Sequence, residues 1–151
     1  KTTVSYKSSN TKVATVDKNG KVTIKGVGTA KITITAAAKN NYKAATKTVT
    51  IKVAKAAPTI KVKTTSANVR YANLRSRAQV FSLGASVNSK GKLTYKKVSG
   101  SSAISVASNG RVTVKKGMKK GTYKAVIRVY AGAKGNYNSG YKTVTVTVRV
   151  R

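Results

Sequence analysis

The chain has 151 residues, enough for two small domains, and carries 32 Lys and Arg residues against a single acid, Asp17, for a formal net charge of +31. It contains no His and no Cys. This composition excludes a Ser-His-Asp relay, a catalytic carboxylate pair, a disulfide framework, and metal sites that need His, Cys or several acids. A Ser-Lys pair remains, but with Lys this frequent a Ser-Lys neighbour carries no information. We therefore expect no enzyme, no metal and no other cofactor.

The first part of the chain is predicted to form short strands. Short β-rich runs flank Asn19-Gly20, a dipeptide that favours a type I′ hairpin turn. Ile32 and Ile34 alternate with polar residues, and farther on Val49, Ile51 and Val53 do the same. Such alternation is typical of strands that bury one face of an antiparallel sheet.

A short joint follows at Ala54–Pro58. Proline removes a backbone donor and favours extended geometry in the residue before it. The sequence therefore predicts two domains, residues 1–57 and 58–151, joined by a segment too short to act as a floppy tether.

The second domain repeats the first. The matching runs occur in the same order, at separations that grow from 89 to 95 residues: Val4–Lys7 with Leu93–Lys96, Asn19–Lys25 with Asn109–Lys115, Gly28-Thr29 with Gly121-Thr122, Asn41-Tyr42 with Asn136-Tyr137, and Lys47–Thr50 with Lys142–Thr145. The segment from Thr59 to Lys92 has no counterpart before Val4. The first domain should therefore lack its N-terminal strands.

The fold prediction is an all-β chain of tandem immunoglobulin-like antiparallel β-sandwiches, the first incomplete. Val144, Val146, Val148 and Val150 alternate along the last strand. No window shows the apolar spacing of a helix, so we expect almost no helix and no transmembrane segment. The opening Lys1–Val4 has no Met and no signal-peptide pattern, and we expect an internal piece of a longer chain.

The first domain resembles the bacterial Ig-like domain, group 2. The residues that carry the resemblance are Tyr6–Asn10, Val13–Asp17, Asn19–Val22 and Gly28–Thr33. The second domain resembles it more loosely through Tyr95-Lys96, Ile104–Val106, Asn109–Val112 and Gly121-Thr122, and has Ala107 where the first has Asp17. The resemblance implies extracellular modules of a bacterial, Gram-positive surface or cell-wall protein, with neighbouring Ig-like repeats as partners and no shared catalytic site.

The charge suggests binding of anionic polymers such as teichoic acid, acidic glycans or nucleic acid, because cations that neutralise phosphates release condensed counterions. The domain 58–151 has most of the charge and no acid. The candidate polyanion-binding residues are Arg70, Arg75, Arg77, Lys96, Lys97, Lys115, Lys116, Lys119 and Lys120. For Arg70–Arg77 the alternative is a strand pair with exposed Arg side chains, and for Lys115–Lys120 a solvated hairpin. Sequence-specific nucleic-acid binding is not expected, because no groove-entering helix is predicted.

The tyrosines divide into two groups. Tyr42 and Tyr137 recur at equivalent positions, which favours a packing role with the hydroxyl bonded to backbone. Tyr130 and Tyr141 do not recur, because Ala37 and Thr46 are their counterparts, and we treat them as candidate exposed aromatic contacts.

Two other readings remain open. In the first, the Lys residues, which are spread along the chain, serve only to solvate the sheets, and the chain is a structural spacer without a specific ligand. Alternatively, the chain is a subunit of a surface filament, in which a neighbour supplies the missing strands.

Overall fold

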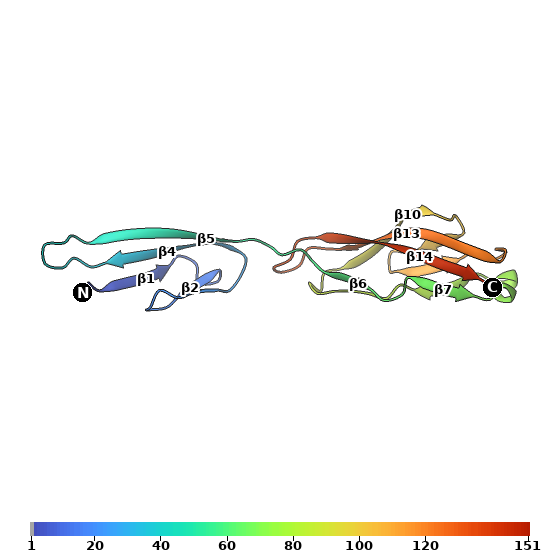
Figure 1. The fold of residues 1–151 in the computed structure, drawn as a ribbon, viewed down its shortest axis with the longest axis horizontal. Helices are drawn as coiled ribbons and strands as arrows, with labels where there is room; N and C mark the ends of the chain where they lie inside the picture. Colours follow the sequence, from blue (N-terminus) through green and yellow to red (C-terminus); the bar gives the residue numbers. More distant parts are fainter. Residues whose placement is uncertain (1) are drawn as a thin grey trace. The chain divides into compact units, whose positions relative to one another are not determined.

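The computed structural model describes residues 2–151 and is 57% strand and 4% helix, which confirms the all-β prediction (Figure 1). Its contacts divide the chain into two compact units, Lys1–Lys55 and Ala56–Arg151. Ala56 belongs to unit 2 because its N–H donates to the carbonyl of Asn136 at 2.9 Å, and its carbonyl accepts from Asn138 at 2.9 Å.

Unit 1 contains five strands: β1 (Val4–Ser8), β2 (Ala14–Val16), β3 (Val22–Ile24), β4 (Gly28–Ala36) and β5 (Ala45–Val53). They form an antiparallel sheet of order β1-β4-β5 and a two-stranded hairpin, β2-β3. The buried core between them is small and consists of Val13, Ala14 and Ala30, with Ile51 and Val53 packed against it.

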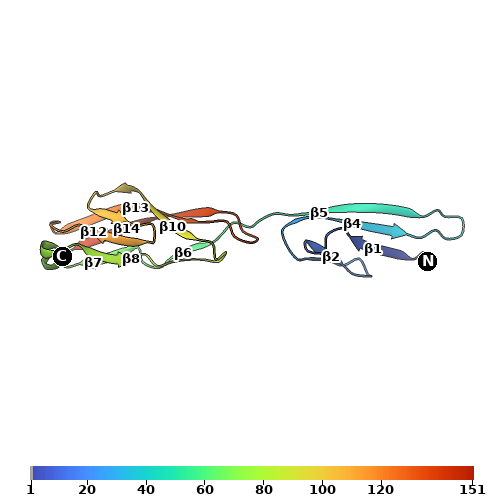
Figure 2. The same ribbon diagram turned by 180° about the vertical axis from the view of Figure 1, so that it is seen from behind.

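Unit 2 contains β6 (Ile60–Val62), β7 (Ser66–Val69), α1 (Tyr71–Ser76), β8 (Gln79–Ser82), β9 (Ala85–Val87), β10 (Leu93–Gly100), β11 (Ile104–Val106), β12 (Arg111–Val114), β13 (Gly121–Ala131) and β14 (Gly140–Val150). The main sheets have the orders β10-β13-β14-β7 and β11-β12-β8, and β6 pairs with β9. Figure 2 shows β8 and β12 beside each other. Most inward residues of both sheets form one core, and a second, smaller cluster joins Ile60 of β6 to Val129 and Ala131 of β13.

Strand register shows that the units are copies of one design. In unit 1 Ala30 pairs with Ile51, and in unit 2 Ala125 pairs with Val146. Strands β1–β5 therefore correspond to β10–β14, and among residues 2–55 no elements correspond to β6–β9, as predicted. Register also shifts the alignment of β4 with β13 by two residues. Thr35, not Ala37, occupies the position of Tyr130, and Gly28 occupies the position of Tyr123, so the predicted match of Gly28-Thr29 with Gly121-Thr122 is wrong.

The turns at Asn19-Gly20 and Asn109-Gly110 are present, but their predicted type is wrong. Gly20 and Gly110 have φ of 84° and 86°, whereas positive φ at other residue types occurs, among the described residues, only at Asn40 and Lys90. The N–H of Gly20 donates to the carbonyl of Asp17 at 3.1 Å, and Gly110 donates in the same way to Ala107 at 2.9 Å. Each hairpin thus has a longer loop that ends on one left-handed glycine.

A tyrosine from the first common strand lies against each of these glycines. A Cβ at Gly20 would be 2.9 Å from the ring of Tyr6, and one at Gly110 would be 2.6 Å from the ring of Tyr95. The repeated Tyr-Lys and Asn-Gly motifs are therefore two sides of one contact, since only glycine leaves room for the ring.

Three further expectations differ from the structure. Residues 71–76 form a short helix instead of a strand, because Leu74 is fully buried there in the core of unit 2. Strand β7 pairs in parallel with β14, so the sheets are not antiparallel throughout. Tyr42 is 80% exposed, so the packing role predicted for it is wrong.

Candidate anion-binding surfaces

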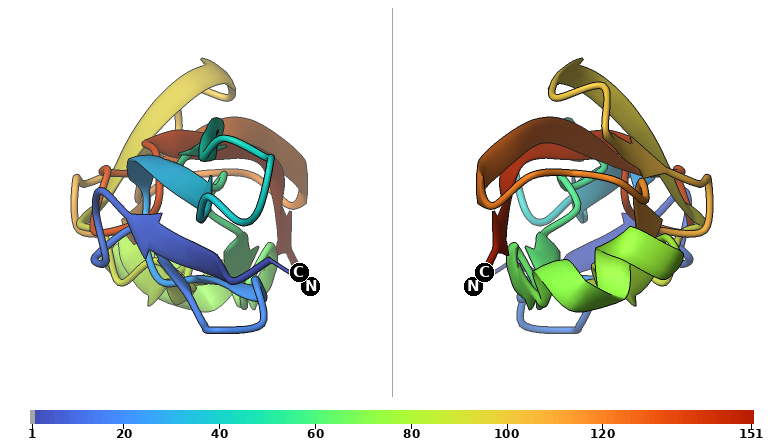
Figure 3. Two further views of the ribbon diagram at one scale, coloured as in Figure 1. Left: turned by 90° about the vertical axis from the view of Figure 1, so that its left-hand side faces the viewer. Right: turned by 90° about the vertical axis from the view of Figure 1, so that its right-hand side faces the viewer.

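Seven of the nine predicted cationic residues gather at one end of unit 2. The N–H of Gly117, in the loop after β12, donates to the carbonyl of Leu74 in α1 at 2.7 Å. The N–H of Tyr71, at the start of the same helix, donates to the carbonyl of Arg151 at 2.6 Å. Figure 3 (right) shows α1 in green beside the C-terminal end of β14. We call this region the cationic end; it comprises Arg70, Arg75, Arg77, Lys115, Lys116, Lys119, Lys120, Arg149 and Arg151.

Buried side chains fix the backbone of the cationic end. Leu74 anchors α1 in the core, and Met118, which is 7% exposed, anchors the loop. The hydroxyl of Tyr123 also donates to the carbonyl of Lys119 at 3.0 Å. The cationic side chains themselves are exposed. A fixed backbone with several exposed cationic side chains suits an anionic polymer better than a single small ion.

Lys96 and Lys97 lie apart from the cationic end. Lys96 pairs with Arg128 in the middle of the sheet, about 23 Å along β13 from Gly121 at 3.3 Å per residue. The half-buried Lys97 points its ammonium at the carbonyls of Ser101 and Ile104, the second at 2.9 Å. Its geometry gives Lys97 a structural role, because these carbonyls already accept from the ammonium.

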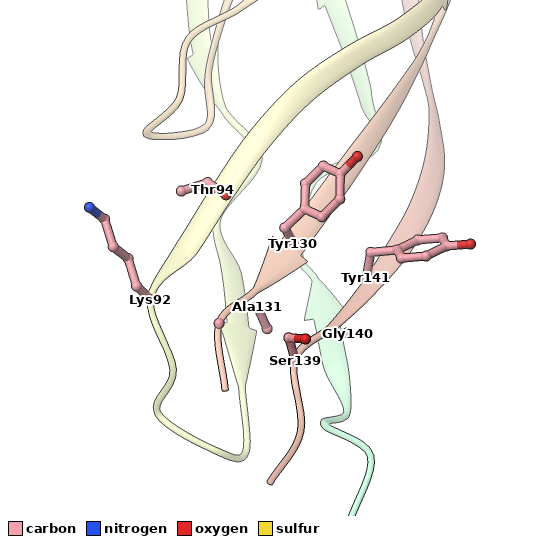
Figure 4. Close-up of a pocket in the computed structure, with 8 residues that line it drawn as sticks. Lys92, Thr94, Tyr130, Ala131, Ser139, Gly140 and Tyr141 are labelled. Atoms are coloured by element: carbon pink, nitrogen blue, oxygen red, sulfur yellow. The ribbon is translucent and has the colours of Figure 1, made fainter. Parts of the chain in front are cut away.

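Tyr130 and Tyr141 lie together on the outer face of the main sheet. They are directly opposite each other on β13 and β14, with ring centroids 5.9 Å apart and planes tilted by 51°. Tyr141 is 62% exposed. With Lys92 and Thr94 from the β10 side and Ser139 and Gly140, they line an open hollow of about 710 Å³ (Figure 4). We call this the tyrosine hollow.

Arg128 holds the two tyrosines in place. Its guanidinium carbon lies 4.6 Å from the ring centroid of Tyr141, a cation–π contact, and its Nη1 donates to the hydroxyl of Tyr130 at 3.5 Å. This hydrogen bond, followed by the electrostatic effect of Tyr130, raises the pKa of Arg128 above its ordinary value, while burial acts in the opposite direction. The buried Nε has no hydrogen-bond partner among the described residues.

Sequence reasoning did not single out Arg128, Arg149 or Arg151. Alternation along β13 does place Arg128 and Tyr130 on the same outward face, so a signal was present. The gathering of Arg70–Arg77 with Lys115–Lys120 had no such signal, because the two segments are far apart in the sequence and meet only through α1 and the core.

No helix in residues 2–151 is long and apolar enough to cross a membrane. Within the same residues there is no group of three or more His, Cys, Asp or Glu side chains that could hold a metal ion.

Comparisons with known proteins agree with this architecture. Residues 1–38 match the family model of the intimin immunoglobulin-like domain. No curated protein sequence matches the chain. Human protocadherin-24 EC1-2 is similar in structure, with 17% identity, a TM-score of 0.51, and coverage of 99% of this chain and 82% of that chain. Drosophila N-cadherin EC1-4 gives 14% identity and a TM-score of 0.49, with 99% and 42% coverage; this chain thus spans less than half of that protein. The chain is therefore an all-β protein of Ig-like modules, similar at its start to the Ig-like domain of intimin and in fold to cadherin repeats.

Proposed function

We propose that the chain is a non-catalytic stalk or adhesion module of a bacterial surface protein, and that unit 2 binds anionic cell-wall or host polymers at its cationic end. Under this proposal it belongs to the group 2 bacterial Ig-like modules of Gram-positive cell surfaces or walls. The Tyr6–Gly20 and Tyr95–Gly110 contacts support that assignment, because they involve residues that carry the resemblance.

One observation carries the binding proposal: nine cationic residues gather at one end of a unit that contains no acid. No Asp or Glu side chain of unit 2 competes for these cations, so an external anion is their natural counter-charge. Each polymer phosphate, sulfate or carboxylate neutralised there releases condensed counterions, which makes binding strong at low salt and weak at high salt.

The competing function is that of a spacer whose Lys and Arg residues only keep the sheets solvated and separate. The two proposals differ in whether the affinity for polymers depends on where in the chain positive charges are removed. A spacer that binds polymers through net charge alone loses the same affinity wherever four charges are removed, whereas a site at the cationic end loses more when they are removed there.

The test compares two variants, each of which lacks four positive charges, one at the cationic end and one in unit 1. The site variant is Lys115→Gln, Lys116→Gln, Lys119→Gln and Lys120→Gln, and the matched control, all in unit 1, is Lys12→Gln, Lys18→Gln, Lys43→Gln and Lys47→Gln; all eight side chains are exposed. Binding to teichoic acid, heparin and duplex DNA is measured from roughly 50 to 500 mM salt, beside polylysine.

We expect the site variant to lose at least about tenfold more affinity than the control and to show a flatter dependence on salt, by nearly one unit of slope per lost phosphate contact. Equal losses in the two variants, together with displacement of the wild type at the same salt as polylysine, would establish the spacer.

The tyrosine hollow favours polymers that contain sugar rings, because exposed aromatic faces stack on the apolar face of a sugar while Lys92 is available for an anionic group. Its volume is within the range of sites for small molecules. Tyr141→Ala should therefore weaken binding of acidic polysaccharides and leave binding of polyphosphate, which has no ring, unchanged. If both polymers respond equally to Tyr141→Ala, the hollow has no part in recognition.

A further inference from the structure

Unit 1 exposes apolar side chains whose counterparts in unit 2 are buried. Val22 and Ile24 of β3 are 38% and 51% exposed, whereas Val112 and Val114 at the same positions of β12 are 0% exposed. Both pairs occupy the same register in their hairpins, Val22 opposite Val16 and Val112 opposite Val106. The difference therefore arises from what lies over the hairpin and not from the hairpin itself.

The second sheet of unit 1 shows the same difference. Val4 of β1 and Val49 of β5 are 41% and 45% exposed. Their counterparts, Leu93 and Val144, are half-buried, because they pack with residues of β6 and β9. The side chains that cover them are Ile60, Val62, Ala85 and Val87.

An unpaired strand edge accompanies the exposed face. In unit 2 the outer edge of β12 pairs antiparallel with β8, with Val112 opposite Phe81 and Thr113 opposite Val80. In unit 1 the corresponding sheet consists of β2 and β3 alone within the described residues. The outer edge of β3 thus offers backbone donors and acceptors to an added strand.

The two units differ in their content of bulky apolar residues. The bulky side chains Leu74, Phe81 and Leu83, which fill the core of unit 2, all come from the segment 59–92. Residues 1–55 contain no Leu, Phe or Met. Residues 1–55 therefore supply none of the bulky side chains of the kind that fill the core of unit 2.

We propose that the face formed by Val4, Val22, Ile24 and Val49, together with the outer edge of β3, is a strand-acceptor surface. Its occupant is a covering segment of the type 59–92, the segment that covers the corresponding face of unit 2. The occupant pairs antiparallel with β3 in the register of β8, so that its Phe81-type residue lies opposite Val22 and its Leu83-type residue fills the core. This surface is independent of the proposed anion binding, which involves unit 2.

Unit 2 fixes the identity of this occupant. A second copy of unit 1 offers the acceptor no Leu or Phe side chain to fill its core. The covering segment of unit 2 in the same molecule is already engaged, and its tether gives it a high effective concentration at its own site. A free copy of segment 59–92 carries the Leu and Phe side chains and is not already bound to a unit 2 of its own.

The test adds a synthetic peptide of residues 59–92 to the full chain and follows backbone hydrogen exchange by mass spectrometry. We expect saturable 1:1 binding and an increase of at least about tenfold in the protection of the amides of residues 21–25. A peptide that carries Phe81→Asp and Leu83→Asp should not protect them. In the full chain, Val22→Lys with Ile24→Lys should abolish the protection, whereas Thr23→Lys, on the opposite face of β3, should retain it.

A fusion provides a second measurement that does not depend on the affinity of the peptide. Residues 59–92 are placed directly before Val4 of the full chain, in the same order as in unit 2, with the doubly substituted segment as control. We expect the native segment, and not the control, to raise the thermal stability of unit 1 and the protection of β3. Absence of both effects, or dimerisation of the unfused chain that protects β3 without any peptide, would overturn the proposed occupant.

Discussion

One substitution made at equivalent positions in both units measures the energetic effect of the covering segment. Val112 in β12 is 0% exposed and Val22 in β3 is 38% exposed. Both lie at the turn end of equivalent hairpins, opposite another valine, so strand propensity contributes equally to Val112→Ala and Val22→Ala.

At Val112 the substitution removes two buried methyl groups, worth about 1.6 kcal/mol of transfer free energy, and adds a cavity term, for a total of about 2 to 3 kcal/mol. At Val22 the methyl groups are already partly hydrated and water fills the space, so the loss should stay below about 1 kcal/mol. In a unit of this size, 2 to 3 kcal/mol corresponds to a fall in Tm of roughly 8 to 24 °C.

The assay is urea or thermal unfolding followed by hydrogen exchange, with peptides from each unit as separate reporters. Val112→Ala should strongly lower the unfolding free energy reported by the peptides of unit 2 and leave that of unit 1 unchanged. Val22→Ala should lower the unfolding free energy reported by the peptides of unit 1 only weakly. If the two substitutions destabilise their units by the same amount, within about 0.5 kcal/mol, burial does not distinguish the units and the argument for a strand acceptor loses its basis.

Two further pairs of substitutions test local contacts in unit 2. Gly110→Ala introduces both backbone strain at a φ of +86° and a collision with the ring of Tyr95, whereas Gly117→Ala, at a φ of +78° with nothing within 4 Å, introduces the strain alone. In urea unfolding, Gly110→Ala should therefore lower the free energy of unfolding by about 1 to 3 kcal/mol more than Gly117→Ala does. Equal effects would contradict the tyrosine contact. Lys97→Met removes an ammonium bonded to two backbone carbonyls and should cost about 1 to 2 kcal/mol, whereas the exposed neighbour Lys96→Met should stay within about 0.5 kcal/mol. A larger loss from Lys96→Met in the same titration would reverse the assigned roles.

The sequence by itself determined the features that depend on short-range patterns. Alternation of Val and Ile with Thr and Lys defined the last strands of each unit, and glycine after asparagine defined the hairpin turns. The repeat predicted that β1–β5 have counterparts in β10–β14 and that the segment from Thr59 to Lys92 has no counterpart before Val4. These features follow from sequence because strand periodicity and turn geometry are set by neighbouring residues.

The tertiary structure decided the features that depend on long-range contacts. Residues 71–76 became helical because Leu74 enters the core, although no helical pattern surrounds it. Lys97 bonds to carbonyls of a following turn, while Lys96 next to it remains exposed. Arg128 joined the two tyrosines through a contact that crosses from β13 to β14. Periodicity assigns a residue to a face of its strand, but only the packing of other segments decides whether that face meets water, a cation or a core.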